Sequence, residues 1–170
     1  PAFGVVLIAA GREVGGGDSR SDVGALAHIT EYAELGPGLY QLKCVMGERI
    51  RVVEWLPDDP YPRAVVETWP DQPGAAVDVE AIRDIEDRMV ALFERIATAR
   101  GAQVNARDIV HGADESGQAA MWLAALTSRL PMGQADRYSV LAAPTAAERV
   151  VALSEAVDTV TAMVEFQLSE

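Results

Sequence analysis

The chain has 170 residues, enough for one large domain or two small ones, and 49% of them are hydrophobic, as in ordinary globular proteins. Its 14 basic and 26 acidic side chains give a formal net charge of −12, which would repel a phosphate backbone, so nucleic acid is excluded as the expected partner. No stretch approaches the roughly 18 consecutive apolar residues of a membrane-spanning helix, so no membrane partner is expected.

The first part of the chain, residues 1–72, has the pattern of short strands and tight turns. An apolar, β-branched run over residues 3–8 predicts a buried strand, and the glycines of residues 15–19 predict a loop. Alternate apolar residues from Val23 to Ile29 predict a second strand with one apolar face. Gly36-Pro37-Gly38 predicts a tight turn that returns the chain into a third strand.

This third strand is predicted over residues 39–46 and 49–55, with a bend or bulge at Gly47-Glu48 between them. In the second piece, Ile50 and Val52 share one face, and the arginines at 49 and 51 share the other. Prolines 57, 60 and 62 exclude regular pairing, and residues 61–69 predict one more strand.

Cys44 is the single cysteine of the chain, so no intramolecular disulfide is expected. Its strand-like surroundings predict a buried, inert thiol. The apolar run at the start of the chain has no basic segment before it and does not match a secretory signal. Together these features predict a protein of the reducing cytoplasm.

The second part of the chain, residues 73–170, has the pattern of helices. Asp78 is a good N-cap for a helix with apolar residues at helical spacing, and Gly101 is placed to end that helix. Shorter helices are predicted over residues 116–129 and 133–141. A capping-box pattern at Thr145 to Glu148 begins the last helix, whose apolar stripe predicts packing on the first helix as an antiparallel pair.

Three patterns that could carry chemistry fail on inspection. Gly11 and Gly16 have the spacing of a phosphate-binding loop, but Gly17 stands in place of its lysine. His28 and Glu31 would point to opposite faces of a strand. His111 lies with Asp114 and Glu115 in a polar segment without a second histidine. We therefore expect no catalytic residues, no metal site and no cofactor, and predict that the chain is not an enzyme.

The aromatic residues around the proline-rich turn are a weaker indication of a functional site. Trp55, Leu56 and Tyr61 are the candidate peptide-binding residues, because they could form a surface patch that receives apolar segments. Ordinary core filling is the more common role of each of the two aromatic side chains.

Two long motifs carry a resemblance to a known family: GREVGGGDSRSDVGALAHI at residues 11–29 and VMGERIRVVEWLPDDPYPRAVVE at residues 45–67. In this order, and followed by helices, they resemble the N-terminal substrate-binding domain of Lon-type ATP-dependent proteases. The closest likeness is to a stand-alone short form that lacks the ATPase and protease domains. The resemblance implies an α+β fold, with a PUA-like β-barrel over residues 1–72 and a C-terminal helical bundle over residues 73–170 of the same domain.

The resemblance also implies a role. The chain would be a non-catalytic protein- or peptide-binding module that holds unfolded or damaged proteins, or delivers them to a partner protease or ATPase. The alternative is a small-ligand or RNA-binding PUA-like barrel. The family's opening strands, of the Phe-Pro-Leu kind, are not found before Phe3. A strand edge would then be exposed, which predicts a homodimer through that edge.

Overall fold

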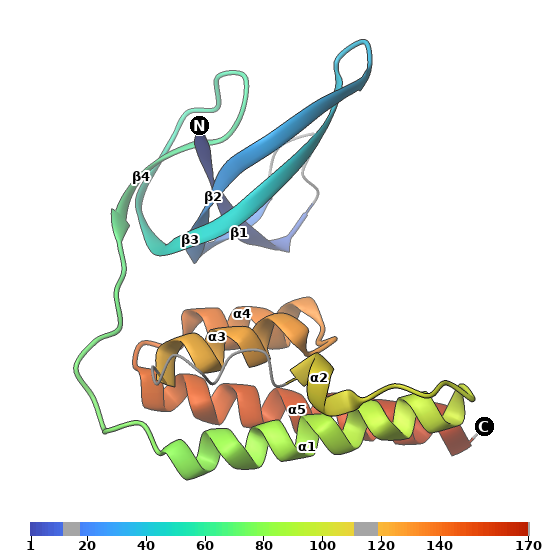
Figure 1. Cartoon of the computed structure of the whole chain (residues 1–170). Coiled ribbons are helices and arrows are strands. Elements are labelled where there is room, and N and C mark those ends of the chain that lie inside the picture. The colour runs from blue at the N-terminus through green and yellow to red at the C-terminus, as the bar shows by residue number, and fades with distance from the viewer. Residues whose placement is uncertain (12–17, 111–118, 170) are drawn as a thin grey trace. The chain divides into compact units, whose positions relative to one another are not determined.

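The computed structural model describes residues 1–11, 18–110 and 119–169. It divides into two compact units, Pro1–Pro70 and Asp71–Glu170. All the strands of the described residues lie in the first unit and all the helices in the second, so the chain has the predicted α+β composition (Figure 1).

Four antiparallel strands form one sheet in the order β1-β2-β3-β4. Their bounds are Ala2–Ala10, Ser19–Gly36, Leu39–Leu56 and Arg63–Thr68. β2 and β3 have 18 residues each and form a hairpin whose turn includes Gly38, at a φ of 73°. β1 and β4 are the two edges of the sheet, and no pairing joins them in the described residues. The structure therefore shows an antiparallel sheet, and closure of this sheet into the predicted PUA-like β-barrel is not seen in the described residues.

The pairing of β2 with β3 has three register shifts, and two of them bear on the site. Ala25 pairs with Arg49 but Ala27 pairs with Met46, so β3 has an extra residue at the predicted Gly47-Glu48 bend. Further along, Ile29 pairs with Cys44 and Glu31 with Lys43, which leaves Thr30 as the extra residue of β2. The Thr30 hydroxyl donates a hydrogen bond to the Lys43 carbonyl oxygen at 3.0 Å.

Burial along the strands follows part of the prediction. Val23, Ala25 and Ala27 are all buried, which confirms the apolar face predicted for β2. The predicted first strand also exists, but it is not buried, because Phe3 is 43% and Val5 is 42% exposed. As an edge strand, β1 has a neighbouring strand on one side, so its side chains have fewer residues to pack against.

Trp69 stabilises the sheet where β4 ends. Its backbone N–H donates to the Arg49 carbonyl oxygen at 2.8 Å. The guanidinium groups of Arg49 and Arg51 lie 4.6 and 5.2 Å from the centroid of the indole ring, on the face opposite Ile50 as the alternation predicted. These cation–π contacts stabilise two arginine side chains next to the apolar face of β2.

The helical unit contains five helices in the described residues. Their bounds are Val79–Ala99 (α1), Ala106–Val110 (α2), Ala119–Arg129 (α3), Gln134–Ala142 (α4) and Ala146–Ser169 (α5). The predicted Asp78 cap is confirmed, since its side chain accepts from the Glu80 N–H at 3.0 Å. The capping box is confirmed too, because the Glu148 N–H donates to Thr145 Oγ1 while the Thr145 N–H donates to Glu148 Oε2. α2 was not predicted, and residues 116–118 of the predicted second helix lie outside the described residues.

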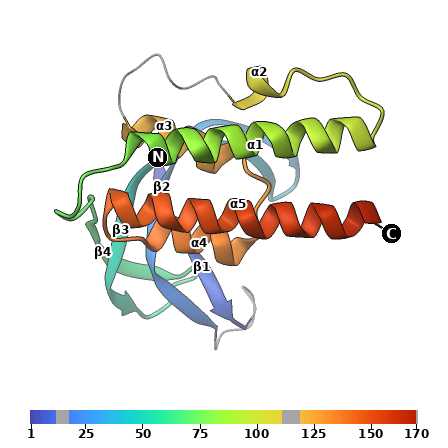
Figure 2. The ribbon, with the colours of Figure 1, turned by 90° about the horizontal axis from the view of Figure 1, so that it is seen from below.

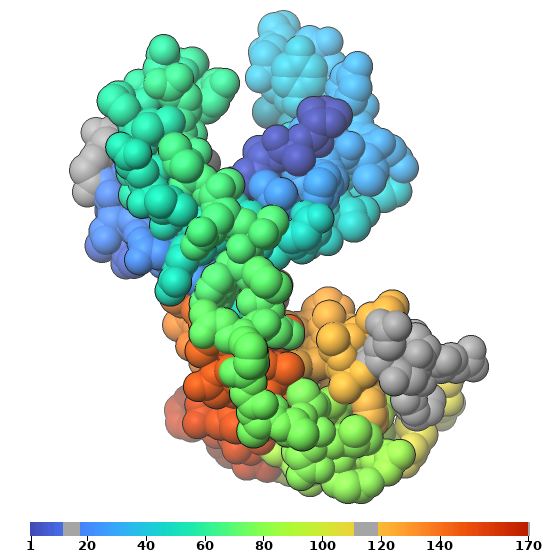
Figure 3. Space-filling view, turned by 90° about the vertical axis from the view of Figure 1, so that its left-hand side faces the viewer, coloured from blue at the N-terminus to red at the C-terminus, as the bar shows by residue number. Residues whose placement is uncertain are grey.

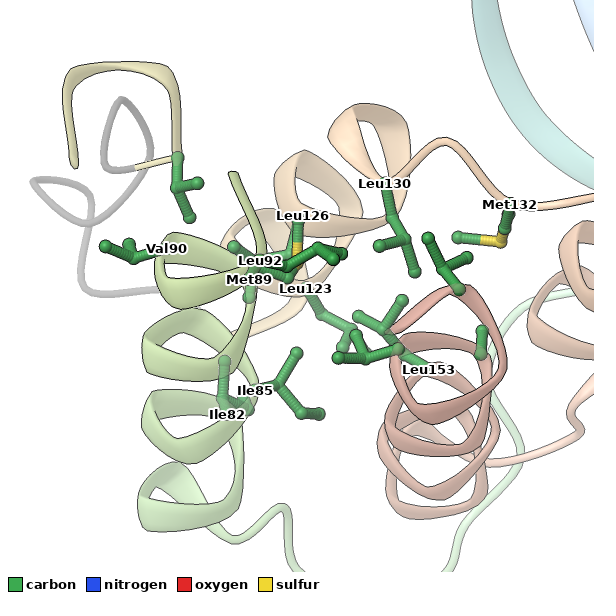
Figure 4. Close-up of a cluster of buried hydrophobic side chains, with 14 of the residues drawn as sticks. Ile82, Ile85, Met89, Val90, Leu92, Leu123, Leu126, Leu130, Met132 and Leu153 are labelled. Atoms are coloured by element: carbon green, nitrogen blue, oxygen red, sulfur yellow. The ribbon is translucent and has the colours of Figure 1, made fainter. Parts of the chain in front are cut away.

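One hydrophobic core is shared by these helices (Figure 4). The stripe predicted for the last helix is buried in it: Val150, Leu153, Val157, Val160 and Val164. From α1 the core takes Ile82, Ile85, Met89, Val90 and Leu92, and from α3 it takes Trp122, Leu123 and Leu126. The periodic apolar residues are thus core residues.

The predicted antiparallel pairing of the first and last helices is wrong. Arg88 of α1 donates to Asp158 of α5 at 2.7 Å. Further along both helices, Arg95 of α1 forms an ion pair with Glu165 of α5 at 3.0 Å. Because the residue numbers rise together, α1 and α5 run parallel (Figure 2). The intervening helices α2, α3 and α4 return the chain to the end at which α1 began, a route that spacing within each helix does not reveal.

A pair of substitutions on α5 tests this core. Leu153→Ala should lower the free energy of unfolding by about 2–5 kcal/mol, because Leu153 is fully buried and a cavity would remain. Val151→Ala on the same helix should change it by less than about 0.5 kcal/mol, because Val151 is 57% exposed. Denaturant unfolding followed by circular dichroism measures both. Equal effects of the two substitutions would contradict the assigned core.

Candidate functional site

The outer part of the long hairpin is paired only with itself in the described residues. On one side, β1 pairs with β2 as far as His28, and the Ile29 N–H donates to the Pro1 carbonyl oxygen at 3.0 Å. On the other side, pairing with β4 begins only at Ile50. Residues 30–36 and 39–43 therefore form a two-stranded extension, which we call the arm (Figure 1).

Pairing within the arm gathers apolar side chains on one face. Tyr32 lies opposite Leu42, and Tyr40 lies opposite Glu34, all on the same face because side chains alternate along each strand. The same face continues to Met46, which shares a row across the sheet with Ala27 and Phe3. We call the set Phe3, Tyr32, Tyr40, Leu42 and Met46 the arm face.

The arm face is open to solvent in the described structure. Tyr32 is 74% exposed and Met46 is 56% exposed, and the other three members are between 43% and 53% exposed. The opposite side of the arm has the Glu31–Lys43 ion pair at 2.9 Å and also the exposed apolar side chain of Leu39. Two-stranded hairpins have little stability of their own, and exposed apolar patches commonly mark sites of interaction. The arm is thus a hairpin with exposed apolar side chains, and its arm face is uncovered in the described residues.

The space-filling view shows the arm from one side (Figure 3). The tip of the hairpin, in light blue, projects as a lobe, and the first residues of the chain, in dark blue, lie against it. A hollow separates this lobe from the turn of residues 57–62, in green. The hollow lies wholly within the sheet unit, Pro1–Pro70.

The bulge at Thr30 changes the relative placement of His28 and Glu31, which were considered above as metal ligands. His28 and Glu31 lie opposite Val45 and Lys43, which share a face of β3, so the two side chains are on one face and the predicted opposite placement is wrong. Their partners differ, however, since His28 Nε2 is 3.7 Å from a Glu48 carboxylate oxygen and Glu31 pairs with Lys43. Within residues 1–11, 18–110 and 119–169, no group of three or more His, Cys, Asp or Glu side chains could hold a metal ion.

Other candidates from the sequence fall elsewhere. His111, Asp114 and Glu115 lie outside the described residues, as do Gly16 and Gly17 of the rejected phosphate-binding loop. Cys44 is half-buried, not fully buried as predicted. In the part of the chain that the structure describes, no helix is both long and apolar enough to cross a bilayer.

The predicted peptide-binding residues lie at the end of β3 and in the turn after it. Trp55 and Leu56 pair with Ala64 and Arg63 of β4 and are half-buried. Tyr61 is 65% exposed, and its carbonyl oxygen accepts from the Asp59 N–H at 3.1 Å across the cis Asp59-Pro60 bond. Of the three, Tyr61 therefore offers the largest open surface.

Arg20 occupies one face of Trp55. Its guanidinium carbon lies 4.9 Å from the centroid of the indole ring. The same guanidinium pairs with Asp18 at 2.5 Å and with Asp58 at 3.3 Å. Hydrogen bonding by Arg20 holds the pKa of the Asp18 carboxyl below its ordinary value of 3.8, and the two carboxylates raise the pKa of Arg20. This network links β2 to the turn after β3.

Titration of Asp18 tests the network. Because its pKa is lowered in the folded protein, the pairing stabilises the fold above the ordinary pKa and is lost as the pH falls through the lowered value. We expect Arg20→Gln to raise the pKa of Asp18 toward 3.8, as measured by NMR of the carboxyl carbon. Arg63→Gln, which removes a guanidinium that instead donates to the Pro57 carbonyl oxygen, is the control and should leave the Asp18 pKa unchanged. An unchanged Asp18 titration in Arg20→Gln would contradict the assigned contact.

The residues of the arm face were not predicted as a site from the sequence. The sequence did contain an indication of the arm in the lengths of the predicted strands. The strands predicted at residues 3–8 and 61–69 are too short to flank the whole of a hairpin from Val23 to Trp55. A long hairpin between short neighbours must leave part of itself without adjacent strands.

The fold and the arm define an α+β domain with an open apolar hairpin. Residues 1–159 match the family described as the ATP-dependent protease La (LON) substrate-binding domain. This match covers most of the 170 residues, so the chain belongs to that family, as the motifs of residues 11–29 and 45–67 indicated. Comparison with curated proteins gives no match.

Proposed function

We propose that the chain is a non-catalytic protein-binding module that holds extended apolar segments of unfolded or damaged proteins on the arm face. The exposed apolar face of the arm is the observation that carries this proposal. Membership of a family of substrate-binding domains supports it. Delivery of the bound protein to a partner protease or ATPase, in the cytoplasm, is the role that this family and the single Cys44 favour.

Hydrophobic burial is a sufficient driving force. Full burial of one large apolar side chain stabilises a complex by about 1.5–3 kcal/mol, and the arm face has five partly exposed ones. Association and ordering of the bound segment offset much of this gain. An affinity in the micromolar range, about −8 kcal/mol, is therefore expected and suits a protein that must release what it holds.

Charge narrows the class of segment. The chain has a formal net charge of −12, so segments that combine apolar with basic residues should be preferred. Part of the affinity should fall with added salt, since exposed charges are screened. The same charge disfavours RNA, which was the alternative ligand for a barrel of this type.

Trp55, Leu56 and Tyr61 are the second candidate surface. The exposure of Tyr61 favours it, whereas the Arg20 guanidinium already covers one face of Trp55. The arm face and this second surface both belong to the sheet unit. Separate substitutions in each surface can be compared in the same binding assay.

Binding of a fluorescently labelled, permanently unfolded protein tests both the proposed function and the assignment of the binding site to the arm face. We expect the double variant Tyr32→Ser, Leu42→Ser to weaken binding at least about ten-fold, because it removes apolar area from the arm face. Phe166→Ser on α5 is the control, since Phe166 is 65% exposed but lies in the helical unit, and it should bind as the wild type does.

The remaining outcomes separate function from location. If Trp55→Ala with Tyr61→Ala weakens binding and the arm variant does not, the function stands and the turn is the site. If unfolded proteins bind no better than their folded counterparts, the proposed function is wrong. Circular dichroism of each variant verifies that it is folded.

A further inference from the structure

The chain after α1 turns back beside that helix and forms a pocket with its last two turns (Figure 1). Gly101, at a φ of 64°, follows the end of α1, and the Ala102 N–H donates to the Ala97 carbonyl oxygen at 2.9 Å. Residues 102–105 then face the helix across a pocket of about 550 Å³, a size found in small-molecule sites. The pocket belongs to the helical unit, whereas the arm face belongs to the sheet unit.

Oxygen acceptors gather in this pocket. Glu94 supplies a carboxylate that is exposed and makes no ion pair within the described residues. Gln103 and Asn105 supply carboxamide groups, and neither side chain has a hydrogen-bond partner in the part of the chain that the structure describes. The Thr98 hydroxyl donates to the Glu94 carbonyl oxygen at 2.8 Å, so its oxygen atom can still accept a hydrogen bond.

The charge around these acceptors is negative. A helix has a partial negative charge at its C-terminal end, and α1 has no basic residue in its last turn to offset it. Among the described residues, the lining of the pocket includes no Lys, Arg or His. Anions are therefore disfavoured. A divalent cation is disfavoured too, because such ions prefer several carboxylates and the described lining has one, that of Glu94.

An apolar wall completes the pocket and narrows the class of cation. Val104 is 47% exposed, and Ala97 and Ala102 add their methyl groups to the lining. Apolar surface beside oxygen acceptors suits a charged group at the end of a methylene stem, as in lysine. We propose that this pocket binds a primary alkylammonium group, supplied by a lysine side chain of a partner protein or by a free small amine.

The donors and acceptors of such a complex match. An ammonium group has three N–H donors and no acceptor, and the oxygen atoms of Glu94, Gln103 and Asn105 supply acceptors for them. The methylene stem would lie against Val104. The pocket would bind this group whether or not the arm face holds a protein, because the two surfaces share no residue.

An NMR titration of the 15N-labelled chain tests the site. The probes are cadaverine and a blocked Ala-Lys-Ala tripeptide, and the control is the same tripeptide with norleucine in place of lysine. We expect cadaverine and the lysine peptide to bind with a dissociation constant of about 1 mM. Chemical shifts should change mainly for the backbone amides of residues 97–105 and the side-chain amides of Gln103 and Asn105. The norleucine peptide should cause no such changes.

Removal of one carboxylate tests the role of Glu94. Glu94→Gln should raise the dissociation constant at least about three-fold, because it removes the charge and keeps the size of the side chain. Asp87→Asn is the matched control, since Asp87 is exposed on α1 outside the pocket and its loss changes the net charge by the same amount. It should change the dissociation constant by less than about 1.5-fold. Equal effects of the two substitutions would overturn the site.

The two probes distinguish the sources of the ammonium group. Binding of both assigns the pocket to a lysine side chain of a partner protein, and binding of cadaverine alone assigns it to a free amine. Binding of neither probe overturns the proposal, as do shift changes spread over the acidic residues of both units. Loss of unfolded-protein binding in the arm variant, with amine binding unchanged, concerns the arm face alone.

Discussion

The difference in length between the central hairpin and its neighbours is the constraint on which the sheet unit depends. β2 and β3 have 18 residues each, whereas β1 has nine and β4 has six. Backbone pairing therefore supports the inner half of the hairpin from both sides and leaves the outer half as the arm. The uncovered apolar face of the arm follows from this difference.

The helical unit was largely predictable because its signals are local. Asp78, Thr145 and Glu148 form the expected caps, since capping needs only residues within one helical turn. The apolar stripe of α5 is buried for a similar reason, as helical spacing alone places it on one face. The direction of α5 relative to α1 depends on the route of the intervening chain, which spacing does not encode. α2, from Ala106 to Val110, is too short to show a period.

The sheet and the candidate site were less predictable, because they depend on contacts between distant residues. The bulge at Gly47-Glu48 was visible in the sequence, but the one at Thr30 was not, and it alone places His28 and Glu31 on one face. The choice of Trp55 and Tyr61 relied on their aromatic character. Nothing near Trp55 in the sequence indicates that Arg20 covers its ring. The opening of the arm face likewise depends on where β4 ends.

The parallel arrangement of α1 and α5 has a consequence for how the helical unit folds. The hydrogen bonds from Arg88 to Ser154 and Asp158 join residues that are 66 and 70 positions apart. Two helices that are adjacent in sequence can form their contacts by closing a short loop. Contacts between α1 and α5 instead require closing a loop that contains α2, α3 and α4. The entropy of closing so long a loop raises the barrier. The unit is therefore expected to fold more slowly than a helical protein whose contacts are mainly local, and to keep its first and last helices apart until late in folding.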